Sequence, residues 1–349
     1  MEDLGIDQKF LIPRQVKRLR DVAGTYTYFA DRDVLLAKIT PCFENGKLGI
    51  AAGLSNGVGF GSSEYVVFRP SERLAPEWLY YYLSRQAFRV EGAGQMAGAV
   101  GHRRVAKDFI EHYPIPVPPV EEQQRIVAIL DEAFAAIVTA RANAERNLRN
   151  AREVFESHLH SVFSERGEGS KETTVNHIST NLDSKRIPIT KTDRVSGEYP
   201  YYGASGVVDH VADYIFEGDT LLISEDGANL LARSTPIAFS VSGKYWVNNH
   251  AHVLKFANMA TQRFVEFYLG SVKVDGYITG AAQPKLTQTA LNSIPIPIPE
   301  SVDAQAGIVQ RIDALTEQAD RLASLSKRKL AALEMLKRSL LHQAFSGDL

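Results

Sequence analysis

The stretch that decides the fold is Val120-Glu-Glu-Gln-Gln-Arg-Ile-Val-Ala-Ile-Leu-Asp131, because the chain repeats it. The second copy is Val302-Asp-Ala-Gln-Ala-Gly-Ile-Val-Gln-Arg-Ile-Asp313. The offset between the two copies holds without a gap further on, where Ser157-x-Leu-His160 corresponds to Ser339-x-Leu-His342. A register kept over this length indicates an internal repeat, so we expect two related halves.

Each copy opens a segment of about 45 residues that is nearly free of Gly and Pro. Apolar residues recur in the second segment at spacings of three and four: Ile308, Ile312, Leu315, Ala319, Leu322, Leu333, Leu336 and Leu340. This period predicts a long amphipathic helix. At 1.5 Å per residue each helix would be about 65 Å long, too long to be buried against a small domain. We therefore expect the two helices to pack as an antiparallel coiled coil.

Alternating prolines precede each helix, at 114–119 and 295–299, and impose an extended backbone. Upstream of the prolines, short β-branched and aromatic runs such as 33–38, 65–68, 219–224 and 252–256 are typical of strands. In both halves an Asp-x-Leu-Leu strand, a glycine-bearing loop, a second strand and an aromatic helix follow in the same order (78–83; 264–269). The sequence therefore predicts an α+β protein in which two mixed, strand-rich units alternate with two long helices.

Composition excludes several classes of protein. The chain of 349 residues has 44% hydrophobic and 23% charged residues, as a globular protein of two or three domains has. A net charge of −2 excludes binding of polyanions by bulk charge alone. Cys42, the single cysteine, allows neither an internal disulfide nor a cysteine-based zinc site. No apolar run approaches the roughly 18 residues of a membrane span, and no signal peptide is evident, so we expect a cytoplasmic protein.

Two common enzyme templates are missing: a phosphate-binding loop and a His-Glu-x-x-His zinc helix. The glycine-rich run 57–61 fits a hairpin or loop better than a dinucleotide site, because no helix signal follows it. The segment 224–227 fits a turn, with a metal or acid–base site as the alternative. Its Ser224, Glu225 or Asp226, combined with His250 or His252, would be the residues of a hydrolase, which is the weakest of our readings.

Polar residues at equivalent places suggest binding of nucleic acid. Just before the proline stretches, one half has Gly-His-Arg-Arg at 101–104 and the other Gln-Pro-Lys at 283–285. Arg and Lys bind guanine edges or phosphates, and Gln and Asn pair with adenine, although solvated surface charge explains such residues equally well. The candidate DNA-binding residues are Lys38, Asn45, Lys47, Arg103, Arg104, Asn229, Arg233, Lys244, Asn248, Asn249, Gln283 and Lys285. We expect no catalytic residue and no metal ligand among them.

Two dissimilar units that each lead through Pro-Ile-Pro-x-Pro into a helix beginning with acidic residues and Gln, then Ile-Val and Asp, resemble the specificity subunit of type I restriction-modification enzymes. The resemblance covers nearly the whole chain and is most specific at 114–131, at 295–313 and at the ending Ser339-Leu-Leu-His-Gln-Ala-Phe-Ser-Gly347. It implies target-recognition domains at 1–119 and 166–299, with spacer helices at 120–165 and 300–349. A polar linker at 166–171 would separate the first helix from the second domain.

The resemblance further implies a non-catalytic protein that reads double-stranded DNA. Each target-recognition domain would contact one half of a split asymmetric sequence, and the helices would hold the domains at a fixed distance, so that half-sites lie roughly one helical turn, about 34 to 36 Å, apart. The helices would also bind two methyltransferase subunits, and a motor-nuclease subunit would complete the complex. S-adenosylmethionine and ATP would bind to those partners, and the chain itself would need no cofactor.

One departure from the family concerns the first domain. Its Asp-x-Leu-Leu strand begins already at Asp33, whereas a longer stretch separates the linker at 166 from the second such strand at Asp219. We expect the first domain to be short at its N-terminus, where the family has another strand-forming segment. Either Met1 is a misassigned or internal start, or the chain is a rearranged gene product. The alternative function is a coiled-coil adaptor whose two units bind proteins rather than DNA, and sequence-specific DNA binding would separate the two readings.

Overall fold

The computed structural model describes residues 2–99, 101–164, 169–280 and 282–349. The chain forms two compact units: unit 1 is Met1–Arg146 with Ser326–Leu349, and unit 2 is Asn147–Leu325. Half of the expected polar linker, at 166–168, lies outside the described residues. Within the described ranges, no helix combines the length and the apolar character that crossing a membrane requires.

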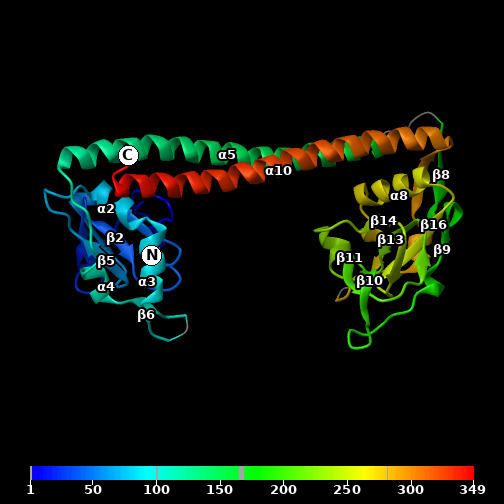
Figure 1. The fold of residues 1–349 in the computed structure, drawn as a ribbon, viewed down its shortest axis with the longest axis horizontal. Helices are drawn as coiled ribbons and strands as arrows, with labels where there is room; N and C mark the ends of the chain where they lie inside the picture. Colours follow the sequence, from blue (N-terminus) through cyan, green and yellow to red (C-terminus); the bar gives the residue numbers. More distant parts are fainter. Residues whose placement is uncertain (1, 100, 165–168, 281) are drawn as a thin grey trace. The chain divides into compact units, whose positions relative to one another are not determined.

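The two predicted long helices are α5 (Val120–Ser164) and α10 (Val302–Ser346), each of 45 residues, and they pack together (Figure 1). Contacts inside unit 1 show that they are antiparallel. The Arg125 guanidinium donates to the Leu349 carbonyl at 2.7 Å, and Arg141 pairs with Glu334 at 2.9 Å. As the residue number rises along α5 from Arg125 to Arg141, that of the partner falls from Leu349, just beyond α10, to Glu334 within it, which confirms the antiparallel prediction.

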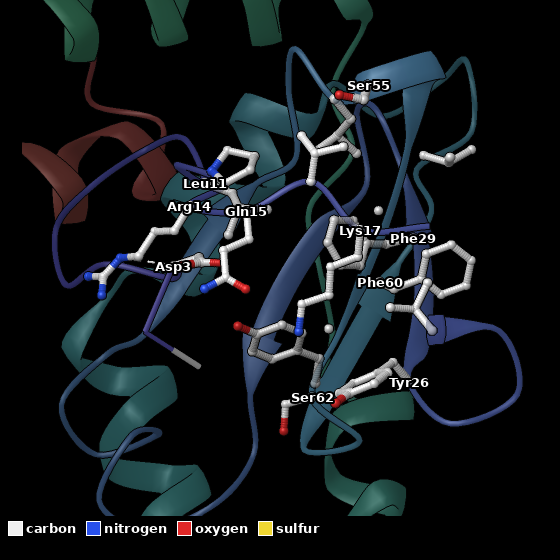
Figure 2. Close-up of a pocket in the computed structure, with 18 of the residues that line it drawn as sticks. Asp3, Leu11, Arg14, Gln15, Lys17, Tyr26, Phe29, Ser55, Phe60 and Ser62 are labelled. Atoms are coloured by element: carbon white, nitrogen blue, oxygen red, sulfur yellow. Dashed lines mark ion pairs between the residues drawn. The ribbon is translucent and has the colours of Figure 1, made fainter. Parts of the chain in front are cut away.

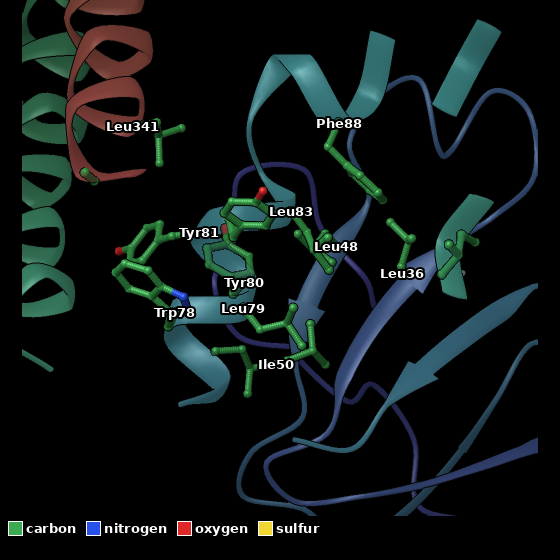
Figure 3. Packing of buried hydrophobic residues seen from close by; sticks show 14 of the residues in the cluster. Leu36, Leu48, Ile50, Trp78, Leu79, Tyr80, Tyr81, Leu83, Phe88 and Leu341 are labelled. Carbon is green, nitrogen blue, oxygen red and sulfur yellow. The ribbon is translucent and has the colours of Figure 1, made fainter. Parts of the chain in front are cut away.

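Unit 1 is built on the antiparallel sheet β3-β2-β5 (Leu48–Ile50, Val34–Ala37, Tyr65–Phe68), whose strand β2 is buried throughout. The aromatic helix α2 (Pro76–Leu83) packs on this sheet, and Leu341 of α10 joins the same core (Figure 3). Trp78 and Tyr82 of α2 donate to the carbonyls of Pro116 and Pro114, both at 2.8 Å. The aromatic helix thereby fixes the proline stretch. The other elements are α1 (Leu19–Val22), β1 (Thr27–Ala30), η1 (Ser55–Gly57), β4 (Val58–Gly61), α3 (Gln86–Gly94), β6 (Met96–Ala97), β7 (Arg104–Val105) and α4 (Lys107–Glu111).

The expectation of a loop or hairpin at the glycine-rich run 57–61 is wrong for most of the run. Val58–Gly61 is strand β4, which pairs with β1 from a distant part of the chain. The glycines are needed because Phe29 packs closely against the strand: a Cβ at Gly59 would lie 2.3 Å from its ring. A close approach of this kind favours glycine inside a strand.

Unit 2 contains two four-stranded sheets, β14-β13-β16-β9 and β11-β10-β15-β12. The helix α8 (Met259–Ser271) covers the first sheet, and Phe264 and Val265 reach its core. The proline stretch forms strand β19 (Pro295–Pro299), which pairs with β8 (Ser170–Thr174). The remaining elements are α6 (Val175–Ile178), β9 (Ser179–Asn181), η2 (Asp183–Lys185), β10 (Ser196–Gly203), β11 (Gly206–Val211), β12 (Phe216–Glu217), β13 (Thr220–Ser224), α7 (Asn229–Ala232), β14 (Ala238–Val241), β15 (Lys244–Val247), β16 (Ala251–Phe256), η3 (Asp275–Tyr277), β17 (Ile278–Thr279), β18 (Lys285–Leu286) and α9 (Gln288–Ser293).

The two units share one frame. A central buried strand (β2; β13) lies between two antiparallel neighbours, and the aromatic helix (α2; α8) packs on that sheet. A small two-stranded ladder follows in each unit, β6 with β7 and β17 with β18, and then a short helix, α4 or α9. The repeat that the long helices revealed therefore extends into units whose sequences differ.

Candidate nucleic-acid interface

The basic loops predicted before the proline stretches lie on two equivalent hairpins, β6–β7 in unit 1 and β17–β18 in unit 2. Each hairpin is hydrogen-bonded to the end of the central strand: Val105 N–H donates to the Lys38 carbonyl at 2.9 Å, and Leu286 N–H donates to the Glu225 carbonyl at 2.8 Å. Arg104 and Lys285, which precede the two donors, therefore occupy the same backbone position in their units.

In unit 1 the residue at that position is held by a carboxylate. Arg104 donates through Nε and Nη2 to both oxygens of Glu64, at 2.9 and 2.7 Å, and through Nη1 to the His102 carbonyl. The hydrogen bonds from Arg104 lower the pKa of Glu64, although burial opposes the shift. Lys38 lies nearby and donates to the Ser63 carbonyl at 3.1 Å. The guanidinium is thus fixed in one orientation at the surface.

In unit 2 Lys285 pairs with Glu225 at 3.1 Å, and the second oxygen of Glu225 accepts from Arg186 at 2.6 Å. The exposures match those of unit 1: the cation side chains are 46% and 50% exposed, whereas Glu64 and Glu225 are 20% and 12% exposed. Each hairpin therefore presents one half-exposed cation that pairs with a mostly covered acid. The acid directly precedes strand β5 in unit 1 and directly follows strand β13 in unit 2.

Behind Lys285, the side chains of Asp183, Glu225 and His252 approach within 4.8 Å of one another, as the ligands of a metal ion do. Arg186 already supplies the positive charge there, at 2.6 Å from Glu225 and 3.5 Å from Asp183. Both ring nitrogens of His252 are already engaged, by the Asp183 carboxylate at 2.6 Å and by the Leu286 carbonyl at 2.8 Å. The cluster is a buried ion network that anchors hairpin β17–β18.

The hydrolase alternative lacks a working geometry. The Ser224 hydroxyl donates to the Ala204 carbonyl, and His250 pairs with Asp226 at 2.9 Å. Among the described residues neither histidine contacts Ser224, so no base is placed to activate that hydroxyl.

The other candidates of unit 1 lie beside hairpin β6–β7. Asn45 is exposed in the turn before β3, and Lys47 is partly buried where that strand begins. Arg103 is 3.8 Å from Glu44. The Thr40 N–H, two residues after Lys38, donates to the Arg103 carbonyl. This bond holds Arg103 and Arg104 near Lys38 at one end of the sheet.

The other candidates of unit 2 divide into two groups. Asn229 and Arg233 serve the fold: Asn229 bonds within its own loop, and Arg233 donates to the carbonyls of Leu269 and Val272 at the end of α8, both at 3.0 Å. The remaining residues are accessible or border accessible loops. Lys244 lies over the Tyr214 ring, Asn248 is buried and accepts from His250 N–H, and Asn249 and Gln283 are exposed.

The structure adds a feature that our sequence reasoning missed, a groove of about 1020 Å³ in unit 1 (Figure 2). The extended segment around Arg14 and Lys17 runs along it, opposite Tyr26 and Phe60. Arg14 pairs with Glu2, whereas Lys17 has no hydrogen-bonded or ionic partner in the part of the chain that the structure describes. The signal was present as three cations within 16–20, but their relation to β1 and β4 depends on the fold.

Comparisons with known proteins identify the family to which a chain with this repeated architecture belongs. A family model described as the type I restriction modification DNA specificity domain matches residues 20–145 and again 169–335. The chain belongs to this family. The specificity subunits that make up the family are non-catalytic and carry no cofactor of their own.

The chain is also similar to curated specificity subunits and, in fold, to chains of solved structures. The EcoAI specificity subunit of Escherichia coli is 44% identical over 114 residues, which are 32% of this chain but 19% of that protein, so the match spans about a fifth of the relative's length. The HsdS subunit of Thermoanaerobacter tengcongensis is similar in fold, with a TM-score of 0.65 and 18% identity over all of this chain and 89% of that one. A chain from a structure of type I R-M system assembly reaches 0.76 at 18% identity, covering 94% and 85%.

Proposed function

We propose that this chain reads a bipartite, asymmetric DNA sequence for a type I restriction-modification complex, with one half-site for each unit. The observation that carries the proposal is the pair of equivalent hairpins, each with a half-exposed cation at the same backbone position. Because the net charge is −2, sequence-specific contacts must come from such local groups. The two units carry different residues around a shared frame, which suits two different half-sites.

The proposal assigns target recognition to residues 1–119 and 166–299, and the spacer to helices 120–165 and 300–349. The base and phosphate contacts would come from the hairpins and adjoining loops: Lys38, Asn45, Lys47, Arg103, Arg104, Lys244, Asn248, Asn249, Gln283 and Lys285. Asn229 and Arg233, which bond to their own backbone surroundings, would support these loops rather than touch DNA.

The partners in this proposal supply all the chemistry. Two methyltransferase subunits, which use S-adenosylmethionine, would bind the repeated parts of α5 and α10, and a motor-nuclease subunit that consumes ATP would join them in the cytoplasm. The internal repeat supports two equivalent binding places, because the same residue types recur at a constant offset in the two helices.

The direct test is co-expression of this chain with the methyltransferase subunit of its own genome, followed by sequencing of the host DNA for methylated adenines. We expect one split motif, absent when the methyltransferase is expressed without this chain. A complex that forms and binds DNA without methylating one defined motif would contradict the proposal. A chain that forms no complex and binds protein partners through its two units would support the adaptor reading instead.

A further inference from the structure

We propose that Arg104 is a guanine-reading residue of unit 1, oriented by Glu64, and that Lys285 at the equivalent position of unit 2 contacts DNA as a simple positive charge. The inference rests on the proposed function and deepens it, because it names the base class that one position of the first half-site must contain. It also assigns a role to Glu64, which the sequence did not point to: its carboxylate would hold the Arg104 guanidinium in the orientation that reads the base.

The donors of Arg104 are distributed as a guanine reader requires. A guanidinium has five N–H groups. Glu64 accepts from Nε and from one N–H of Nη2, and the His102 carbonyl accepts from Nη1. One N–H on each terminal nitrogen is left without a partner among the described residues, and the side chain is 46% exposed. The two terminal nitrogens of one planar guanidinium thus each keep a donor, and such a pair can bind the O6 and N7 acceptors of guanine in the major groove.

The surrounding charges determine whether each cation can leave its acid. Glu64 has Arg104 as its main partner, and Lys38, the other cation that lowers its pKa, donates to the Ser63 carbonyl rather than to the carboxylate. If Arg104 moved away, a mostly covered carboxylate would lose its hydrogen bonds, so we expect the Arg104–Glu64 pair to persist on DNA. A fixed fork selects a base by geometry.

Unit 2 differs at this point. Glu225 keeps Arg186 at 2.6 Å and has His252 at 3.8 Å whether or not Lys285 is in place. Lys285 is therefore free to turn toward a phosphate or a base edge without leaving a buried acid unpaired. Its ammonium group is a flexible point charge and lacks the planar fork, so it supplies attraction more than base selection.

The test is the methylation motif written by the wild-type complex and by complexes that carry Arg104→Ala, Arg104→Lys, Glu64→Gln or Lys285→Ala. For both Arg104 variants we expect one guanine of the first half-site to become degenerate, with discrimination falling roughly 5- to 150-fold at that position. Arg104→Lys keeps the charge, so a matching loss there separates the fork from simple attraction. Glu64→Gln should relax the same position more weakly. Lys285→Ala should leave that guanine unchanged and reduce methylation generally.

The second half-site is the internal control, because a variant that still selects it is folded and assembled. A split motif that keeps every base in Arg104→Ala would overturn the inference but leave the proposed function standing. Uniform loss of methylation in an Arg104→Lys complex that still assembles would also overturn it, because the residue would then supply affinity alone. Absence of any split motif with the wild-type chain would instead refute the proposed function.

Discussion

The pairing of the long helices allows the spacer role to be tested with one change in each helix. In α5 the buried residues Leu130, Ile137, Ala144 and Ala151 recur every seven positions. The covered positions of α10 alternate at spacings of three and four: Val309, Ile312, Thr316, Ala319, Ala323, Ser326, Leu330, Leu333, Lys337, Leu340 and Ala344. A heptad seam of this kind accepts an insertion of seven residues without exposing its apolar positions.

We therefore predict the effect of duplicating residues 140–146 in α5 together with 326–332 in α10. Both segments lie near the Arg141–Glu334 pair, so the helices stay in register. Seven residues at 1.5 Å each lengthen both helices by about 10.5 Å, which corresponds to about three base pairs at ~3.4 Å per base pair. The DNA target should keep both half-sequences and gain about three bases between them.

The assay is selection from a library of duplexes that carry both half-sites at every separation, with the complex immobilised through this chain. Duplication in α5 alone is the control, since it shifts one helix against the other and should weaken the selection without defining a new separation. A doubly lengthened protein that still selects the original separation would refute the view that the helices set the distance between half-sites.

Two further predictions concern the buried ion network of unit 2, with Trp246, the tryptophan of that unit, as the fluorescent reporter in a Trp78→Phe background. Arg186→Ala leaves the carboxylates of Asp183 and Glu225 short of a buried partner, so urea unfolding of unit 2 should show a loss of about 3–5 kcal/mol. Burial alone would raise the pKa of Asp183 and of Glu225, but the hydrogen bond between His252 and Asp183 and that from Arg186 to Glu225 hold both pKa values below their ordinary range. Their stabilisation is thus present above the ordinary carboxyl pKa and lost as the pH falls through the lower folded-state values, so the urea midpoint should drop as the pH falls below about 4. An unchanged midpoint over that range would show that the network does not stabilise unit 2.

The frame could be predicted from the sequence because its signals are local. Periodicity located α5 and α10, and short apolar runs rich in strand-forming residues located β2 and β13. The residues of the helix–helix contact were harder to predict. Leu322 and Leu336, which we expected on the apolar face, are 52% and 47% exposed. The pairing follows the 3.5-residue repeat of a coiled coil, and over many turns that repeat departs from the 3.6-residue count of an isolated helix.

The site could be predicted only in outline, because its partners are brought together by the fold. Arg104 and Lys285 were found from their equivalent places before the prolines. Glu64 lies 40 residues from Arg104 along the chain, and only the docking of hairpin β6–β7 on the sheet joins them. Arg233 was a reasonable DNA contact by residue type, yet its carbonyl partners belong to the end of α8, a helix that lies far from it in the sequence.

If Arg104 contacts DNA as proposed, its pairing with an acid also affects binding to random sequence. Unpaired surface cations attract every phosphate, and each neutralised phosphate adds about 0.9 to the slope of log affinity against log salt. Arg104 is held at the Glu64 carboxylate, and the net charge is −2, so Arg104 should add little to the attraction to random DNA. Glu64→Gln removes this acid, and the complex should then bind non-specific duplex more tightly, with a salt slope steeper by about 0.9, measured by fluorescence anisotropy. An unaltered slope would mean that Arg104 remains turned away from the phosphates even when its acid is gone, so that the hairpin backbone rather than Glu64 determines its direction.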